Sequence, residues 1–234
     1  MYKYLLIDLD DTLLDFKKAE AKAVSIVLKS FGIKPTKKTV ETYSKINKAC
    51  WKRFENGEIS KEEIYIDRVN MLAQRLGVEI EPSGFSKRYL VELSKQGQNS
   101  RFAKRFLKSL LKKGYIIAAV TNGTLATQTG RIARSGLEKY FVGGIFISEQ
   151  IRLKKPDKEF FDFVLKALEV KNKAEVLVIG DSLTSDIKGA VNSGLDSCLV
   201  GGFTDEESSI VPTYHCKNLM QIISVCGLRR NIQN

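Results

Sequence analysis

The stretch "YLLIDLDDTLLDF", residues 4–16, opens with an apolar run and then places three carboxylates, Asp8, Asp10 and Asp11, within four positions. Carboxylates held this close repel one another and raise one another's pKa unless a cation or hydrogen-bond donors compensate. The apolar run is typical of a buried strand. The stretch therefore predicts a strand that delivers carboxylates to a positively charged partner.

Short apolar runs alternate with amphipathic segments from about Gly114 onward. Residues 114–123, 143–149, 176–179 and 196–202 have the pattern of strands, and residues 2–8 add a first strand to the same sheet. Between them, "KPDKEFFDFVLKALEV" (155–170) has apolar residues on one helical face, and "SDIKGAVNSG" (185–194) reads as a short helix that ends at Gly194. This alternation predicts an α/β fold with a parallel sheet.

Residues 16–98 have a different texture, because apolar residues recur there at helical spacing and strand-like runs are absent. Gly, Pro and Asn punctuate the segment at "FGIKP", "ENGEIS", "RLGVEIEPSG" and "KQGQNS". We therefore expect residues 1–15 and 99–234 to form an α/β core, and residues 16–98 to form an inserted helical domain.

The composition is that of a globular protein with an ample core, since 43% of its 234 residues are hydrophobic. No apolar run reaches the roughly 18 residues that a membrane span needs, and "MYKYLLID" is too short and too quickly acidic for a signal peptide. The four cysteines form no C-x-x-C pair, which favours reduced thiols over a disulfide framework or a zinc site. A cytoplasmic protein without a membrane partner is expected.

The formal net charge is +11, which attracts anions such as phosphate esters or nucleic acid. The basic residues are dispersed as "KK" pairs in helical stretches, without an RNA-binding signature or a long basic tail. A solvated basic surface explains the charge at least as well as a nucleic-acid interface. No specific nucleic-acid partner is predicted, and the sequence predicts no oligomeric state.

Polar residues follow three of the expected strands at the point where each strand ends. Asp8 and Asp10 follow the first, Thr121 and Asn122 follow the second, and Asp181 follows the run at 176–179. Parallel sheets bind ligands beyond the carboxyl ends of their strands, so these side chains are expected at one edge. Carboxylates with water are the ordinary ligands of Mg²⁺, which is therefore the expected cofactor.

A phosphate ester held at such a site suggests a division of labour among the carboxylates. Asp8 could attack phosphorus as a nucleophile, and Asp10 could protonate the leaving alcohol and then deprotonate water. Thr121, together with Lys154 or Lys155 from "KKPD", could neutralise the phosphoryl oxygens. Taken singly, "TNG" is better explained as an ordinary turn, and "KKPD" as the start of a surface helix, because turn chemistry alone selects these residues.

The motifs D-x-D-x-T, T-N-G, K-P and G-D-x-x-x-x-D occur in this order along essentially the whole chain. In this order they resemble the haloacid dehalogenase-like hydrolase superfamily. The resemblance implies a Rossmann-like core bearing a helical cap inserted after the first motif. It implies that Asp8 is the nucleophile, Asp10 the acid/base residue, and Thr121 and Lys155 phosphate-binding residues, which leaves Lys154 without a role. Asn122, next to Thr121, is also expected to bind phosphate.

The same resemblance implies a metal site. Its ligands would be Asp8, the backbone carbonyl of Asp10, and Asp181, while Asp186 would support the metal or its water shell. Many relatives have glycine where this chain has Asp11, which predicts a changed local environment and no loss of the chemistry.

The segment "INKACWKRFENGEIS" (46–60), with "LLDF" (13–16), resembles the branch of pyrimidine 5′-nucleotidases that act on noncanonical nucleoside monophosphates. Trp51 or Phe54 could stack on a base, and Asn47 could hydrogen-bond to it. Trp51 could equally fill the interior of the helical domain.

The expected function is that of a Mg²⁺-dependent phosphomonoester hydrolase with an aspartyl-phosphate intermediate, acting on a small phosphorylated metabolite, a pyrimidine nucleoside 5′-monophosphate. A broad-specificity or sugar-phosphate phosphatase, and a phosphomutase of the same fold, remain alternatives. A dehalogenase needs neither a metal nor an acid for a leaving alcohol, so Asp10 and Asp181 argue against it.

Overall fold

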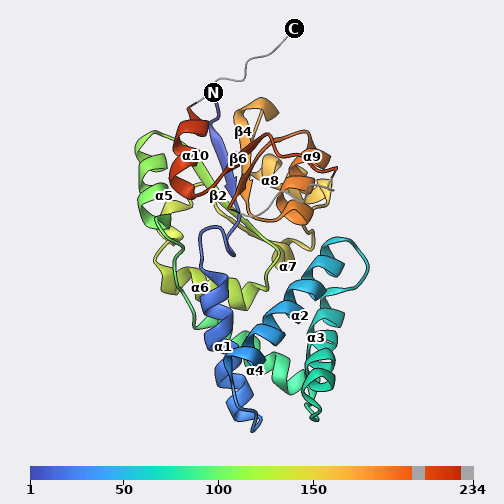
Figure 1. Ribbon diagram of the computed structural model, residues 1–234. Helices are drawn as coiled ribbons and strands as arrows, with labels where there is room; N and C mark the ends of the chain where they lie inside the picture. Colours follow the sequence, from blue (N-terminus) through green and yellow to red (C-terminus); the bar gives the residue numbers. More distant parts are fainter. Residues whose placement is uncertain (202–208, 228–234) are drawn as a thin grey trace. The chain divides into compact units, whose positions relative to one another are not determined.

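A computed structural model describes residues 1–201 and 209–227 of the chain (Figure 1). The chain folds into two compact units. The core unit comprises residues 1–15, 99–125 and the described residues from 136 onward, and the helical unit comprises residues 16–98 and 126–135. None of the described helices is both long and apolar enough to span a membrane.

The core unit is built on a six-stranded sheet in which every neighbouring pair is parallel. The strand order is β3-β2-β1-β4-β5-β6. Its strands are β1 (Tyr4–Ile7), β2 (Ile116–Thr121), β3 (Ile145–Ile147), β4 (Val176–Gly180), β5 (Asp196–Val200) and β6 (Tyr214–Cys216). The predicted parallel α/β sheet is therefore confirmed. The strand β6 was not predicted, because its sequence Tyr-His-Cys is not a continuous apolar run.

Helices pack around this sheet, and most of its strands are separated along the chain by at least one helix (Figure 1). They are α5 (Ala103–Lys112), α7 (Ser148–Ile151), α8 (Lys158–Ala167), α9 (Lys188–Ser193) and α10 (Leu219–Cys226), with single turns at Glu138–Tyr140 and Lys173–Glu175 and a π-helical turn at Leu183–Ile187. Alternate residues of β1, β2 and β4 pack with Phe160 and Phe161 of α8 and with Ala190 of α9. Gly194 ends α9 in the left-handed conformation, as predicted. All four cysteines are buried and free.

The helical unit contains α1 (Phe16–Ser30), α2 (Lys37–Glu55), α3 (Lys61–Leu76), α4 (Pro82–Ser94) and most of α6 (Leu125–Ser135). Local signals set its helix ends: Ser60 and Glu63 form a capping box at the start of α3, and Gly77 ends that helix with φ 64°. The buried apolar faces of α1 to α4 share one core. No strand occurs between residues 16 and 98.

Helix α6 packs with the helical unit, whereas the predicted boundary at residue 98 left it with the core. Two glycines allow this close packing. A Cβ on Gly130 would lie 2.7 Å from the Ser94 carbonyl oxygen, and one on Gly97 would lie 2.6 Å from the Arg134 backbone. Arg131 of α6 is fully buried, and its Nε donates to the carbonyl of Gln96. These contacts join segments that are distant in sequence, so helical periodicity alone does not reveal them.

Candidate active site

Three strand ends bring polar residues to one edge of the sheet. Asp8 directly follows β1, Thr121 is the last residue of β2, and Asp181 directly follows β4. The strands are in parallel register, and the Asp8 amide continues the pairing by donating to the Ile179 carbonyl at 2.8 Å. Because β1 lies between β2 and β4, the Asp8 carboxylate is central to the group.

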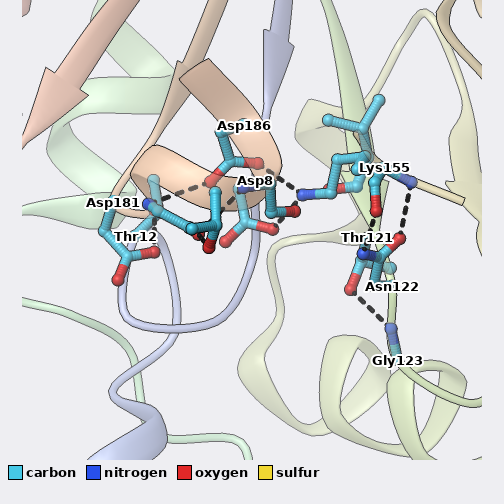
Figure 2. A network of polar contacts seen from close by, with 12 residues as sticks. Asp8, Thr12, Thr121, Asn122, Gly123, Lys155, Asp181 and Asp186 are labelled. Carbon is cyan, nitrogen blue, oxygen red and sulfur yellow. Dashed lines mark hydrogen bonds and ion pairs between the residues drawn. The ribbon is translucent and has the colours of Figure 1, made fainter. Parts of the chain in front are cut away.

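Asp8, Asp181 and Asp186 form an acidic cluster at this edge (Figure 2). Each offers a carboxylate oxygen, and these oxygens all lie within 4.8 Å of one another. Asp8 and Asp186 are buried, with 7% and 1% of their surface exposed, and Asp181 is half-buried. Asp186 reaches the cluster from the π-helical turn that follows β4.

Lys155 supplies the positive charge nearest to this cluster. Its ammonium Nζ lies 2.7 Å from Asp8 Oδ1 and 2.6 Å from Asp186 Oδ1, and it also donates to the Val120 carbonyl at 3.1 Å. Only 1% of Lys155 is exposed. Asp8, Asp186 and the Val120 carbonyl accept all three donor hydrogens of the ammonium group, so the position of Lys155 Nζ is closely defined.

The pKa values of these groups are shifted by burial and by one another. Burial raises the pKa of Asp8 well above its usual range, against the opposing effect of Lys155, and the charges of Asp186 and Asp181 raise it further. Burial, with repulsion from Asp186 and Asp11, raises the pKa of Asp181 to about 8. Burial lowers the pKa of Lys155, but the carboxylates of Asp186 and Asp8 outweigh this effect and raise it.

This donor set fits a divalent cation. Three carboxylates face one ammonium group, so the fully ionised cluster carries two uncompensated negative charges. Carboxylate oxygens are the ligands that Mg²⁺ prefers. Both oxygens of Asp186 already have partners, since Oδ1 pairs with Lys155 and Oδ2 accepts from the Ser182 amide at 3.2 Å. Asp8 and Asp181 are therefore the better direct ligands, with Asp186 as a supporting group.

Two residues that shape the cluster were given no role from the sequence. Thr12 is buried, and its hydroxyl donates to Asp181 Oδ1 at 3.3 Å. Gly180 leaves room for Asp186, because a Cβ there would lie 2.1 Å from Asp186 Oδ2. Thr12 is the last residue of the D-x-D-x-T motif, and Gly180 is the first residue of G-D-x-x-x-x-D. Their positions in these motifs could therefore have identified them as parts of the site.

The "TNG" segment after β2 contributes two buried side chains. The Thr121 hydroxyl accepts from the Gly123 amide at 3.2 Å. The Asn122 side chain pairs with the backbone of Lys155: Oδ1 accepts from its N–H at 2.9 Å, and Nδ2 donates to its carbonyl at 2.8 Å (Figure 2). These contacts join Asn122 to the predicted phosphate-binding lysine, and phosphate binding by Asn122 itself remains a prediction.

The two remaining carboxylates of the first motif are half-buried beside the cluster. Asp10 lies close enough to Asp8 for its charge to raise the pKa of Asp8. Asp11 adopts a left-handed backbone with φ 57°, a conformation that favours glycine and that aspartate tolerates better than most residues. This explains how the position accommodates either glycine or aspartate.

The predicted base-binding residues, Asn47 and either Trp51 or Phe54, lie in the helical unit. Asn47 is 1% exposed, its Nδ2 donates to Glu20 Oε1 at 2.8 Å, and its Oδ1 accepts from Arg68 Nη1 at 3.1 Å. Trp51 is half-buried, packs against the core of the unit, and meets Phe54 edge to face with ring centroids 5.7 Å apart. These residues thus have structural contacts within the unit, and their base contacts remain predictions.

Comparison with known proteins places this site in a family. The sequence matches the model of the haloacid dehalogenase-like hydrolases over residues 2–194. The chain belongs to this family. The resemblance inferred from the four motifs is thereby confirmed, and so is the expectation of a hydrolase. The acidic cluster, Lys155 and Thr121 all lie within the matched residues.

Several known proteins are similar to this chain over most of its length. Pyrimidine 5′-nucleotidase PynA of Streptococcus pneumoniae is 42% identical over 196 residues, which cover 84% of this chain and 82% of that protein. Pyrimidine 5′-nucleotidase YjjG of Escherichia coli is 27% identical over 94% of this chain and 96% of its own length. A crystal structure of the putative HAD-hydrolase YfnB of Bacillus subtilis bound to magnesium superposes on this chain with a TM-score of 0.91. The two sequences are 32% identical, and the match covers 97% of this chain and 99% of that one.

Proposed function

We propose that this chain is a Mg²⁺-dependent phosphatase that hydrolyses nucleoside 5′-monophosphates, with pyrimidine nucleotides as its preferred substrates. The observation that carries the proposal is the cluster of Asp8, Asp181 and Asp186 with Lys155 at the carboxyl edge of the sheet. Such a cluster suits a phosphate monoester, whose charge needs both a metal ion and a lysine to offset it. The names of PynA and YjjG support the nucleotide substrate.

The reaction has two displacement steps. In the first, an Asp8 carboxylate oxygen attacks phosphorus and the bond from phosphorus to the ester oxygen breaks, while Asp10 gives its proton to the leaving alcohol. In the second, Asp10 takes a proton from water, the water oxygen attacks phosphorus, and the bond from phosphorus to Asp8 breaks. Inorganic phosphate leaves, and both carboxyl groups return to their starting states.

The other residues bind and orient the phosphoryl group. The Thr121 hydroxyl donates to its oxygens, and the Lys155 ammonium group, which stays paired with Asp8, offsets their negative charge and that of Asp8. Asp8, Asp181 and the Asp10 carbonyl would hold the metal ion, with Asp186 as a supporting group. When bound, Mg²⁺ offsets the charge on the phosphoryl oxygens and keeps Asp8 ionised despite its burial.

The test is phosphate release with Mg²⁺ and with a chelator, across pyrimidine and purine 5′-monophosphates, sugar phosphates and an aryl phosphate. We expect metal-dependent release with a preference for pyrimidine nucleotides. Asp8→Asn, which keeps the side-chain shape and removes the nucleophile, should abolish release. Metal-dependent release that is unchanged in Asp8→Asn would refute the mechanism. Equal rates on all esters would refute the nucleotide preference, and phosphate transfer between sugar positions without net release would indicate a mutase.

A further inference from the structure

The amide of Asn122 holds the backbone of Lys155 at two points. Its Oδ1 accepts from the Lys155 N–H at 2.9 Å and its Nδ2 donates to the Lys155 carbonyl at 2.8 Å. Both backbone polar groups of one residue are thus satisfied by one side chain, much as a neighbouring strand would satisfy them. Asn122 is 8% exposed, so water competes little for these bonds.

Lys155 needs such support because it lies in a loop between α7 and α8. A loop backbone is more mobile than a strand, yet the Lys155 ammonium group meets Asp8, Asp186 and the Val120 carbonyl at 2.6–3.1 Å. Asn122 directly follows the last residue of β2, an interior strand of the sheet. Its side chain therefore connects the loop that carries Lys155 to the rigid part of the fold.

The chemistry of the contact selects asparagine. A single side-chain amide presents an acceptor and a donor in one plane, which matches the peptide groups of Lys155. Aspartate would keep the acceptor but oppose the Lys155 carbonyl with a second oxygen, and alanine would remove both bonds. Asn192, which donates one bond to the Pro156 carbonyl at 3.0 Å, touches the next residue of the same loop and serves as a comparison.

We propose that Asn122 is the positioning residue of Lys155: its amide fixes the lysine backbone so that the ammonium group stays between Asp8 and Asp186. Asn122 then acts through Lys155 and not as an independent phosphate ligand. This inference rests on the proposed phosphatase function for its kinetic consequences. Its structural content, the placement of the Lys155 ammonium group, does not depend on the substrate.

A double-mutant cycle tests whether Asn122 acts through Lys155 or as an independent phosphate ligand. Asn122→Ala should lower kcat/KM for phosphate release about 10- to 100-fold, because a displacement of about 1 Å in a catalytic group has effects of this size. In a Lys155→Met background, removing Asn122 should change kcat/KM less than about threefold, since the residue it positions is already absent. Effects that multiply in the double variant would overturn the proposal, because they would show that Asn122 acts independently of Lys155.

Two further variants guard against a general loss of structure. Asn192→Ala should stay within about threefold of the wild-type kcat/KM, although it also loosens the loop. A loss as large as that of Asn122→Ala would show that any anchor of this loop matters equally, and would overturn the specific role. Asn122→Asp, which keeps the Oδ1 acceptor, provides a second variant if Asn122→Ala does not fold, and it should also lower kcat/KM.

Crystal structures of Asn122→Ala and of the wild-type protein give a readout that is independent of turnover. We expect the Lys155 ammonium group of the variant to leave hydrogen-bond distance of Asp8 or Asp186. A variant that keeps all three ammonium contacts would overturn the positioning role, even if its activity fell. Failure of the wild-type protein to hydrolyse any ester would instead count against the proposed function, and this structural comparison would still decide the role of Asn122.

Discussion

Gly180 and Asp186 are packed so closely that the first can carry no side chain. A Cβ on Gly180 would lie 2.1 Å from Asp186 Oδ2 and 2.6 Å from Asp186 Cβ. Asp186 in turn pairs with Lys155 at 2.6 Å and accepts from the Ser182 amide at 3.2 Å. The glycine of the G-D-x-x-x-x-D motif thus determines where the second aspartate of that motif lies.

Gly180→Ala should therefore displace the Asp186 carboxylate and weaken its contact with Lys155. We expect phosphate release to fall at least about tenfold, and the free energy of unfolding to fall by about 1–3 kcal/mol, as for other substitutions that overpack a core. Steady-state kinetics and urea unfolding measure the two effects. Gly227→Ala is the matched control, because among the residues that the structure describes its Cβ would meet only the Ser224 carbonyl, at 3.6 Å. Wild-type turnover in Gly180→Ala would contradict this role for Asp186.

The gathering of the catalytic candidates at one edge could be predicted because it follows from periodicity and topology alone. Asp8, Thr121 and Asp181 end or follow apolar runs, and parallel strands align their carboxyl ends. The short helix ending at Gly194 was predictable for a similar local reason. Local pattern and one topological rule therefore predicted five of the six described strands and the place of Asp8, Thr121 and Asp181, whereas Lys155 and Asp186 were identified through the family motifs.

Contacts that join distant loops and helices could not be predicted in this way. The pairing of Asn122 with Lys155 spans 33 positions and depends on the conformation of an irregular loop. The contacts of Asn47 with Glu20 and Arg68 span 27 and 21 positions between separate helices. In each case the residue type suggested a polar role, and only the tertiary structure identified the partner.

The left-handed backbone of Asp11 leads to a prediction about stability. At φ 57°, a Cβ is strained in most residues, whereas glycine adopts this conformation freely. We expect Asp11→Ala to be less stable than Asp11→Gly by about 1 kcal/mol in urea unfolding. Asp11→Asn tolerates the backbone and removes the charge, so it isolates the electrostatic contribution. Equal stability of the alanine and glycine variants would show that the position carries no strain.

The network around Asn47 predicts a structural role that can be separated from base recognition. Asn47→Ala would leave Glu20 and Arg68 buried without their shared partner, and we expect a loss of about 1–3 kcal/mol in the free energy of unfolding. Asn56→Ala, which removes an exposed bond to Glu58, is the control and should change it by less than about 0.5 kcal/mol. If the preference between uridine and adenosine monophosphates shifted while stability stayed constant, the base contact would explain Asn47 better.

The raised pKa of Asp181 has a consequence for stability. An aspartate in an unfolded chain has a pKa of about 3.9, and burial with repulsion from Asp186 and Asp11 raises that of Asp181 to about 8 in the folded protein. The folded state therefore binds this proton more tightly than the unfolded state. The corresponding stabilisation is complete below about pH 4 and is lost as the pH rises through about 8.

Without a divalent cation, the Tm should therefore fall as the pH rises from about 6 to about 8.5. Each kcal/mol of lost stability should lower the Tm by about 2–4 °C. The fall should be larger in the wild type than in Asp181→Asn, which lacks the titrating carboxyl group. Protons and metal compete for the same carboxylates, so millimolar Mg²⁺ should raise the Tm more at pH 8.5 than at pH 6. Calorimetry at both pH values, with chelator and with Mg²⁺, measures these Tm changes. Asp162→Asn, a surface substitution outside the cluster, is the control and should show the same Tm changes as the wild type. An equal Mg²⁺ effect in wild type and Asp181→Asn would exclude Asp181 as a ligand, because a lost ligand must weaken the stabilisation that the ion provides.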